Sequence, residues 1–350
     1  LTDHPIPAIN QELERLETAA RDALGENADD YEIEPSALLR RQIARRCIYG
    51  IDINEIAVEL ARVAVWIHTF IPGLPMSSLD HTLVCANSLT GIGTIDEALD
   101  ALEPNRKAGM PSLFAFEIEQ ALEDARRLLI DAANSSEATK AEVRQAAEAA
   151  AKAAEAAAPT RLLFDAAVAV RIGELPVVAG SAAEIQHLAS AKHVQDRLLK
   201  LNPAHMPFLF PEVFLRESAG FDVLIGNPPW EKLKVERHTF WAHQFPGLKG
   251  LKTAQRNAEM TRLETARPDL LALLNELVRE NEDARAIILS GPYPGMGTGD
   301  VDLFKAFAWR YTQALRTGGR AGLVLPRTAF AGAGMAEWRR TVLSEGSFED

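Results

Sequence analysis

The sequence predicts an α/β protein in which a parallel sheet is interrupted by a helical insertion. Four short apolar runs, typical of buried strands, alternate with segments whose apolar residues recur at helical spacing. This alternation is typical of a parallel sheet. Between the second and third runs lies a segment rich in Ala, Glu, Lys and Arg, and residues 141–158 alone contain eleven alanines. Such a composition favours helix and offers little side-chain volume for a core.

Two helices are expected at the start of the chain. Apolar residues at helical spacing predict a helix over residues 11–24, with Gly25 as its end. Pro35 opens a second helix that runs to Arg46, since proline is well suited to the first position of a helix.

The first strand–helix–strand unit follows directly. Residues 47–53 form an apolar run that contains an acid, Asp52, near its end, and we expect a buried strand there. Asn54 can cap the next helix, which we place at residues 55–70. The positions that form one apolar face of this helix are Ile56, Leu60, Val63 and Ile67. A loop rich in Pro, Gly and Ser leads to a second strand at residues 82–86.

The rest of the chain consists of the inserted segment and a second part with the α/β pattern. We interpret residues 94–220 as a long antiparallel helix pair that projects from the α/β domain. A low-complexity linker is the alternative. A strand at residues 221–226 follows, then a polar stretch with helical portions over 231–290. A helix is expected over residues 301–315, ended by Gly318-Gly319, and a last strand over 321–326.

The overall charge limits the possible partners. The 350 residues contain 37 Lys and Arg against 49 Asp and Glu, a formal net charge of −12, which argues against wholesale wrapping of nucleic acid. Residues 231–256 nevertheless carry six basic and two acidic residues, a local charge of +4. Two cysteines cannot form a disulfide framework or a four-ligand zinc site. Without an apolar span or secretory signal, the chain is expected to be cytoplasmic and without membrane contact.

Polar residues follow three of the expected strands, where open α/β sheets bind their ligands. They are Asp52, Asn87 with Ser88, and the tetrapeptide Asn227-Pro228-Pro229-Trp230. Asp52 is suited to accept hydrogen bonds from two vicinal ribose hydroxyls, because a carboxylate has two acceptor oxygens. The alternative for Asp52 is a charge partner for the positive end of the helix that begins after Asn54.

The tetrapeptide carries the strongest chemical signal. Pro228 and Pro229 remove two backbone N–H donors and hold the chain extended, which leaves carbonyl oxygens free to face outwards. Together with the Asn227 side-chain oxygen they form an acceptor cluster that suits an exocyclic amino group. Trp230 adds a flat face on which a base can stack. The alternative is a tight turn after a buried strand.

Five segments resemble the motifs of S-adenosylmethionine-dependent amino methyltransferases. They are FDVLIGNPPW (221–230, motif IV), CIYGIDINEIAVELAR (47–62, motif II), VCANSLTG (84–91, motif III), DLFKAF (302–307, motif V) and GRAGLVLPRTAF (319–330, motif VI). Their order is similar to that of gamma-group DNA adenine-N6 methyltransferases, and most of all to Eco57I-like restriction-modification methylases.

The resemblance implies an incomplete Rossmann-like class I methyltransferase sheet with a helical insertion. The implied division is 1–93 for the first part of the domain, 94–220 for the insertion and 221–350 for the remainder. The implied cofactor is S-adenosyl-L-methionine, and the implied partner is duplex DNA with a flipped adenine, in restriction-modification or phage defence. No metal is expected, because the sequence has no clustered His, Cys and Asp ligand set.

The resemblance also assigns roles to single residues. Asp52 would bind the cofactor ribose, Ile53 would contact the cofactor adenine, and Asn87 would lie near the adenine amino group. Ser88 is a further candidate for cofactor binding. The family often has Asp where this chain has Asn87. In the motif IV loop, Asn227 and the Pro228 carbonyl would hold the target amino group. Trp230, where Tyr or Phe is commoner, would stack on the flipped base.

Basic residues near the motif IV loop are candidates for phosphate contacts. Lys232, Lys234 and Arg237 follow the loop directly, and Arg327 follows the last expected strand. A solvated helix face is the alternative for the first three.

Some family features have no counterpart in the chain. Residues 1–46 lack the glycine-rich motif I, and the Gly291–Gly299 loop follows motif IV, so we interpret it as a loop on the substrate side. The specificity domain should follow residue 350. With a start at Leu1 and an end at Asp350, we expect a piece of a longer protein whose nuclease and specificity domains, fused or separate, lie elsewhere.

Two alternative functions stay open from the sequence. A protein glutamine-N5 methyltransferase would offer the same planar amino group to an Asn-Pro-Pro-aromatic loop. A fragment that keeps the fold but is catalytically inactive in isolation is the other alternative. The DNA sequence that the protein recognises is not encoded in these motifs.

Overall fold

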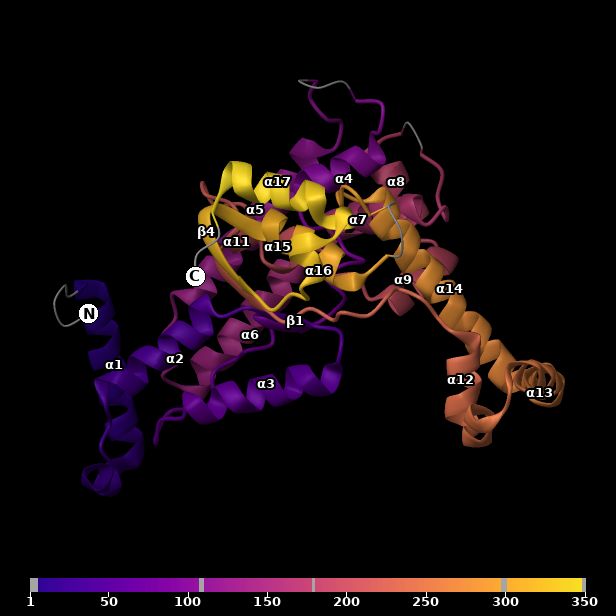
Figure 1. The fold of residues 1–350 in the computed structure, drawn as a ribbon. Coiled ribbons are helices and arrows are strands. Elements are labelled where there is room, and N and C mark those ends of the chain that lie inside the picture. Colours follow the sequence, from indigo (N-terminus) through magenta and orange to yellow (C-terminus); the bar gives the residue numbers. More distant parts are fainter. Residues whose placement is uncertain (1–5, 107–109, 178–179, 297–300, 348–350) are drawn as a thin grey trace.

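The computed structural model describes residues 6–106, 110–177, 180–296 and 301–347, and it shows a mixed α/β fold that is mostly helical (Figure 1). The N-terminal elements are α1 (Pro7–Leu24), η1 (Gly25–Asp30), α2 (Pro35–Cys47), β1 (Gly50–Asp52), α3 (Glu55–His68) and β2 (Leu83–Cys85). Their positions agree with the expected helices and strands to within a few residues. Of the described helices, none combines the length and the apolarity that crossing a bilayer demands.

Helices also fill the segment that we interpret as an insertion. They are α4 (Ile95–Leu102), α5 (Ala115–Ala133), α6 (Lys140–Ala156), α7 (Ala158–Arg171), α8 (Ala182–Ala189), α9 (Lys192–Leu201), α10 (Met206–Leu209) and α11 (Pro211–Phe214). Helices α5 and α6 pack as the expected antiparallel pair. The pair does not project freely, however, because Arg45 of α2 donates to the Ala132 carbonyl of α5 and forms an ion pair with Glu137, between α5 and α6. Helices α5, α6 and α7 share the largest apolar cluster of the described residues, which includes Phe114, Leu122 and Phe164.

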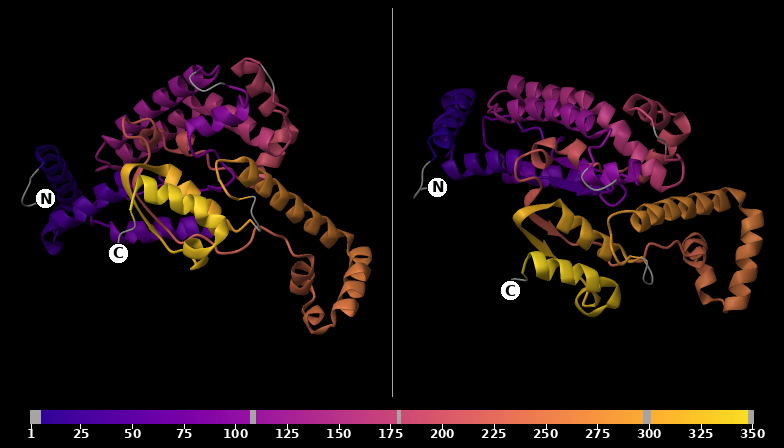
Figure 2. Two further views of the ribbon diagram at one scale, coloured as in Figure 1. Left: turned by 45° about the horizontal axis from the view of Figure 1, so that its top comes forward. Right: turned by 90° about the horizontal axis from the view of Figure 1, so that it is seen from above.

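The C-terminal elements include an arm that extends away from the rest of the molecule (Figures 1 and 2). The elements are β3 (Phe221–Gly226), α12 (Arg237–Gln244), η2 (Pro246–Gly250), α13 (Thr253–Ala266), α14 (Pro268–Ser290), α15 (Leu303–Ala314), β4 (Leu315–Leu323), α16 (Thr328–Ala331), η3 (Ala333–Met335) and α17 (Ala336–Glu345). Helices α12 to α14 form the arm. Residues 291–296 are a loop, as expected, while the rest of the Gly291–Gly299 segment lies outside the described residues.

The described strands form two separate parallel pairs. Strand β1 pairs with β2, and β3 pairs with β4. The single Rossmann-like sheet that we expected is therefore not present as a continuous sheet among the described residues. Strand β4 also begins earlier than expected, because α15 ends at Ala314 and the chain pairs with β3 at once. A register shift between Phe221 and Val223 accommodates Gly318 and Gly319 inside the strand instead of at the helix end.

Helix α3 begins where the sequence indicates, but one of its faces is uncovered. The Asn54 side chain accepts hydrogen bonds from the backbone N–H groups of Ile56 (2.9 Å) and Ala57 (3.3 Å), which confirms the expected cap. The side of the helix that carries Val58 packs against β2. The predicted apolar face points to solvent, with Ile56 70% and Ile67 71% exposed, because strands of three residues cover only one side of the helix.

Aromatic rings join the two strand pairs at their amino ends. The Tyr49 ring, just before β1, lies 5.8 Å from the ring of Phe221, the first residue of β3. Phe210 lies 5.0 Å from Tyr49 and 6.0 Å from Phe221, measured between ring centroids. The helical segment therefore contributes the ring that holds β1 beside β3.

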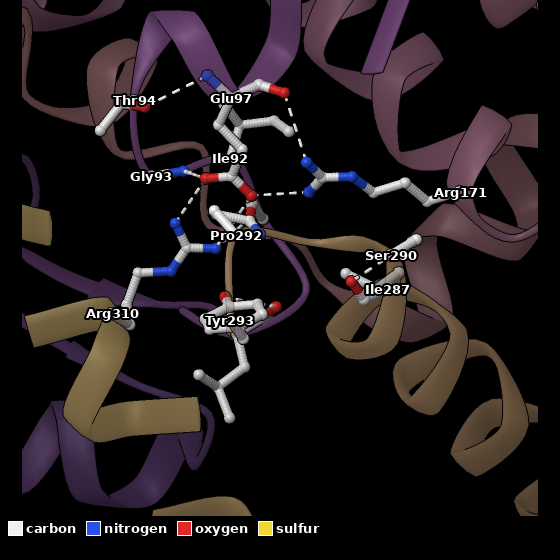
Figure 3. Close-up of polar contacts among 12 residues, drawn as sticks. Ile92, Gly93, Thr94, Glu97, Arg171, Ile287, Ser290, Pro292, Tyr293 and Arg310 are labelled. Carbon is white, nitrogen blue, oxygen red and sulfur yellow. Dashed lines mark hydrogen bonds and ion pairs between the residues drawn. The ribbon is translucent and has the colours of Figure 1, made fainter. Parts of the chain in front are cut away.

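A buried carboxylate fastens the helical segment to α15 (Figure 3). Glu97 of α4 accepts hydrogen bonds from Arg171 of α7 and from Arg310 of α15, each at 2.6 Å, and from the Gly93 backbone N–H at 2.6 Å. Arg310 is fully buried, also donates to the Gly91 carbonyl at 2.9 Å, and lies over the Tyr293 ring. Burial alone would raise the pKa of Glu97, but the two guanidinium groups outweigh it and hold the pKa at about 2.

Removal of the Glu97 charge should destabilise the fold strongly. Glu97→Gln leaves two buried guanidinium groups without a counter-charge, so the free energy of unfolding at pH 7 should fall by about 3–5 kcal/mol. Because the folded-state pKa of Glu97 is depressed from 4.5 to about 2, its contribution is present above pH 4.5 and is lost as the pH falls towards 2. The variant should lose this part of the acid sensitivity.

Urea unfolding at several pH values measures both effects. Asp96→Asn is the matched control, because Asp96 is the exposed neighbour on the same helix. The control should leave the unfolding midpoint nearly unchanged. Equal midpoints for Glu97→Gln and wild type would contradict the role of the ion pairs.

Candidate active site

The residues that follow the strands gather at the carboxyl ends of the two parallel pairs. Asp52 ends β1 and Asn87 follows β2, and because these strands are parallel both residues lie at one edge. Asn227 follows β3 in the same way, and Arg327 follows β4. The placement agrees with the expectation for open α/β sheets, whose ligands bind beyond the carboxyl ends of the strands.

Tyr311 of α15 brings these two edges together. A Cβ atom at Gly226, the last residue of β3, would overlap the Tyr311 hydroxyl oxygen, so the tyrosine fills the space that a side chain would take. Burial raises the pKa of Tyr311, and the Asp52 carboxylate at the end of β1 raises it further. Tyr311 therefore lies close to both carboxyl ends. The sequence analysis assigned no role to Tyr311.

Asp52 presents one oxygen to its own chain and remains open to solvent. Its Oδ1 accepts a hydrogen bond of 2.7 Å from the Asn54 backbone N–H, while the side chain is exposed. Ile53, the next residue, is a large apolar side chain that is 66% exposed. The pair thus offers a carboxylate oxygen beside an apolar surface. Within the described ranges, His, Cys, Asp and Glu side chains do not gather in any group of three that could hold a metal ion.

Asn87 is held in place by the helical segment. Its backbone N–H donates to the Asn202 carbonyl (2.7 Å) and its carbonyl accepts from the Ala204 N–H (3.0 Å). Its side-chain oxygen accepts from the Leu89 backbone N–H at 3.0 Å, which leaves the amide NH2 as a donor. Ser88, beside it, is half-buried. The sequence analysis did not predict this contact with residues 202–204. At Asn202 the backbone is left-handed (φ 43°), and the sequence analysis did not predict that conformation either.

The motif IV loop combines an exposed acceptor with an anchored ring. Asn227 and Pro229 are exposed, Pro228 is buried and Trp230 is 54% exposed. The Trp230 indole N–H donates to the Val324 carbonyl at 3.3 Å, and the Val324 N–H donates to the Gly226 carbonyl at 3.0 Å. The residue that follows β4 therefore holds one edge of the indole, while about half of the Trp230 side chain stays exposed.

The residues that were predicted to bind phosphate differ in their contacts. Lys234 is in an ion pair with Glu236 at 3.9 Å, and Arg237 is hydrogen-bonded to Glu264. The Lys232 backbone forms an antiparallel bridge with Asp302. Arg327 is exposed beside α16, at the carboxyl edge of β4.

Comparison with protein families decides which kind of protein carries this site. The model of the Eco57I restriction-modification methylase family matches residues 46–261, which is more than half of the chain. The chain belongs to this family. No curated protein and no solved structure matches it significantly.

The family match covers most of the site. The methylase range begins just before β1 and ends within α13, so it contains Asp52, Asn87, Asn227 and Trp230. It also contains the helices of the segment between β2 and β3. Membership makes the chain a DNA methyltransferase of restriction-modification type, in agreement with the resemblance of its motifs.

The contact between Gly226 and Tyr311 should be visible in stability measurements. Gly226→Ala places a methyl group against the Tyr311 ring, so the free energy of unfolding should fall by about 1–3 kcal/mol. Gly322→Ala, on the neighbouring strand, meets nothing within 4 Å and should be neutral. In the double variant Gly226→Ala/Tyr311→Ala the clash disappears, so the two effects should not add. Additive urea-unfolding free energies would contradict this geometry.

Proposed function

We propose that this domain transfers a methyl group from S-adenosyl-L-methionine to N6 of adenine in duplex DNA, in restriction-modification or phage defence. The observation that carries the proposal is the motif IV loop, where the exposed Asn227 lies three residues before Trp230, whose indole N–H is hydrogen-bonded and whose side chain is 54% exposed. Membership in the methylase family and the shared carboxyl edge of the two strand pairs support it.

The residues at the end of β1 fit the cofactor. Asp52 keeps one carboxylate oxygen available for the ribose hydroxyls, since only Oδ1 is used by the Asn54 N–H. The exposed Ile53 side chain provides apolar surface for the cofactor adenine. Asn87, clamped through its backbone, presents its amide to the edge of that base. S-adenosyl-L-methionine, when bound, supplies an activated methyl group.

The motif IV loop acts on the target amine. The exocyclic nitrogen of adenine is a poor nucleophile because its lone pair is delocalised into the ring. Asn227 and the Pro228 carbonyl accept its two hydrogens and so localise the lone pair on nitrogen. The amine would gain the methyl group as the sulfur–methyl bond of the cofactor breaks and leaves S-adenosylhomocysteine, and one proton of the amine would pass to water. Positioning supplies much of the acceleration in such a transfer, and no strongly basic side chain is needed.

Trp230 serves a base that has left the duplex. Extrusion of adenine costs a few kcal/mol, and stacking on an aromatic face recovers about 1–3 kcal/mol per base. Because the hydrogen bond to Val324 holds the indole, little side-chain entropy is lost when the base stacks. The half-exposed indole can therefore stack on a flipped base without first being ordered.

The Asn227 side chain tests the proposal most sharply. Asn227→Ala removes one of the two acceptors, so the rate of N6-methyladenine formation by the full-length protein should fall by about 10²–10³-fold. Asn10→Ala, an exposed asparagine on α1, is the matched control and should keep wild-type activity. Mass spectrometry of DNA digests quantifies the modified base. Full activity of the Asn227 variant, or a modified glutamine instead of a modified base, would overturn the proposal.

A further inference from the structure

The arm formed by α12, η2, α13 and α14 has no role in the chemistry described above. It is the part of the molecule that extends farthest from the strand pairs (Figures 1 and 2). We infer that the arm lies along the DNA duplex and that Lys249, Lys252 and Arg256 at its tip bind backbone phosphates about one helical turn from the flipped base. This inference rests on the proposed DNA substrate.

The arm is rooted directly beside the motif IV loop. At the base of the arm, the segment after Trp230 pairs in antiparallel fashion with the segment before α15. There the Leu233 N–H donates to the Val301 carbonyl (2.8 Å) and the Leu303 N–H donates to the Glu231 carbonyl (2.9 Å). These hydrogen bonds lie within three residues of Trp230. A duplex that presents a base to Trp230 therefore passes the root of the arm.

The arm has a fixed shape. The tip has its own apolar cluster, whose buried members are Trp241, Ala242, Leu248, Met260, Leu263 and Leu274. Helix α14 is fastened to α9 of the helical segment by ion pairs of Asp283 with Arg197 and of Glu276 with Lys200. The positive charges of α9 thereby neutralise two acidic side chains of α14.

The tip carries unopposed positive charge. Residues 237–256 contain four basic residues and no acid, and of these Arg237 is paired with Glu264. No acidic side chain of the described residues lies within ion-pair distance of Lys249, Lys252 or Arg256. The first turn of α13 also lacks an acid, so its positive end adds to the same field. Such a patch fits the phosphate backbone of DNA.

Helix α14 is about as long as one turn of the double helix. Helix α14 has 23 residues, which corresponds to about 34 Å at 1.5 Å per residue. One turn of B-DNA is about 34 Å long. The end of α14 at Pro268, where α13 joins it, is therefore displaced from Ser290 by about one turn of DNA. This displacement is the basis for placing the tip contact roughly ten base pairs from the flipped base.

Salt-dependent binding of the full-length protein tests the inference. The probe is a labelled 40-base-pair duplex with a single unpaired adenine at its centre, since an unpaired base costs little to extrude. Lys249→Gln/Lys252→Gln/Arg256→Gln should reduce the slope of log K against log salt by about 2–3, because each phosphate contact contributes about 0.9. Affinity near physiological salt should fall by about 10–100-fold.

A control variant removes the same charge elsewhere. Lys140→Gln/Arg144→Gln/Lys152→Gln changes three exposed cations on α6, far from the arm in sequence, and should leave the slope within about one unit of wild type. If the arm variant keeps the wild-type slope while wild type methylates the duplex, the arm inference is overturned and the proposed function stands. If wild type neither binds nor methylates the duplex, both fail.

Shortened duplexes locate the contact. Truncation of the duplex to six base pairs on one side of the unpaired adenine should lower wild-type affinity, and truncation on the other side should not. The arm variant should be insensitive to both. Equal losses on either side, for wild type and variant alike, would contradict a contact one turn away.

Discussion

The carboxylate of Glu97 is shared by two guanidinium groups that come from opposite parts of the chain. Arg171 belongs to the helical segment and Arg310 to α15, and the Gly93 N–H completes the set. Because α15 also carries Tyr311, which lies close to the carboxyl ends of β1 and β3, this buried contact helps to position that tyrosine. The edge that holds Asp52 and Asn227 therefore depends on a charge cluster that takes no part in the chemistry.

These buried contacts explain how four short strands can present a single edge for ligand binding. The two strand pairs share no hydrogen-bonded ladder among the described residues, so side chains must hold them together. The Tyr49 and Phe221 rings do so at the amino ends and Tyr311 at the carboxyl ends. The helical segment supports both contacts, through Phe210 and through Glu97. Its helices thus belong to the structure of the site.

Local features of this fold were predictable from the sequence and distant ones were not. The Asn54 cap and the bounds of β3, Phe221–Gly226, depend on neighbouring residues and appeared as expected. The expectation of a buried strand was wrong for β3, since Val223 is 58% and Ile225 83% exposed. The ion pair between Glu97 and Arg310 joins residues 213 positions apart, and on α4 Glu97 resembles its exposed neighbours. The uncovered face of α3 has the same cause, since helical spacing shows that a face is apolar but not what covers it.

Hydrogen exchange of the full-length protein tests most directly whether one edge serves both cofactor and base. S-adenosylhomocysteine alone should slow exchange at the amides of Ile53, Asn54 and Ser88. Addition of a duplex with an unpaired adenine should extend protection to Asn227 and Trp230. Protection at the amino ends of the strands, or DNA protection that leaves Trp230 unchanged, would contradict the account.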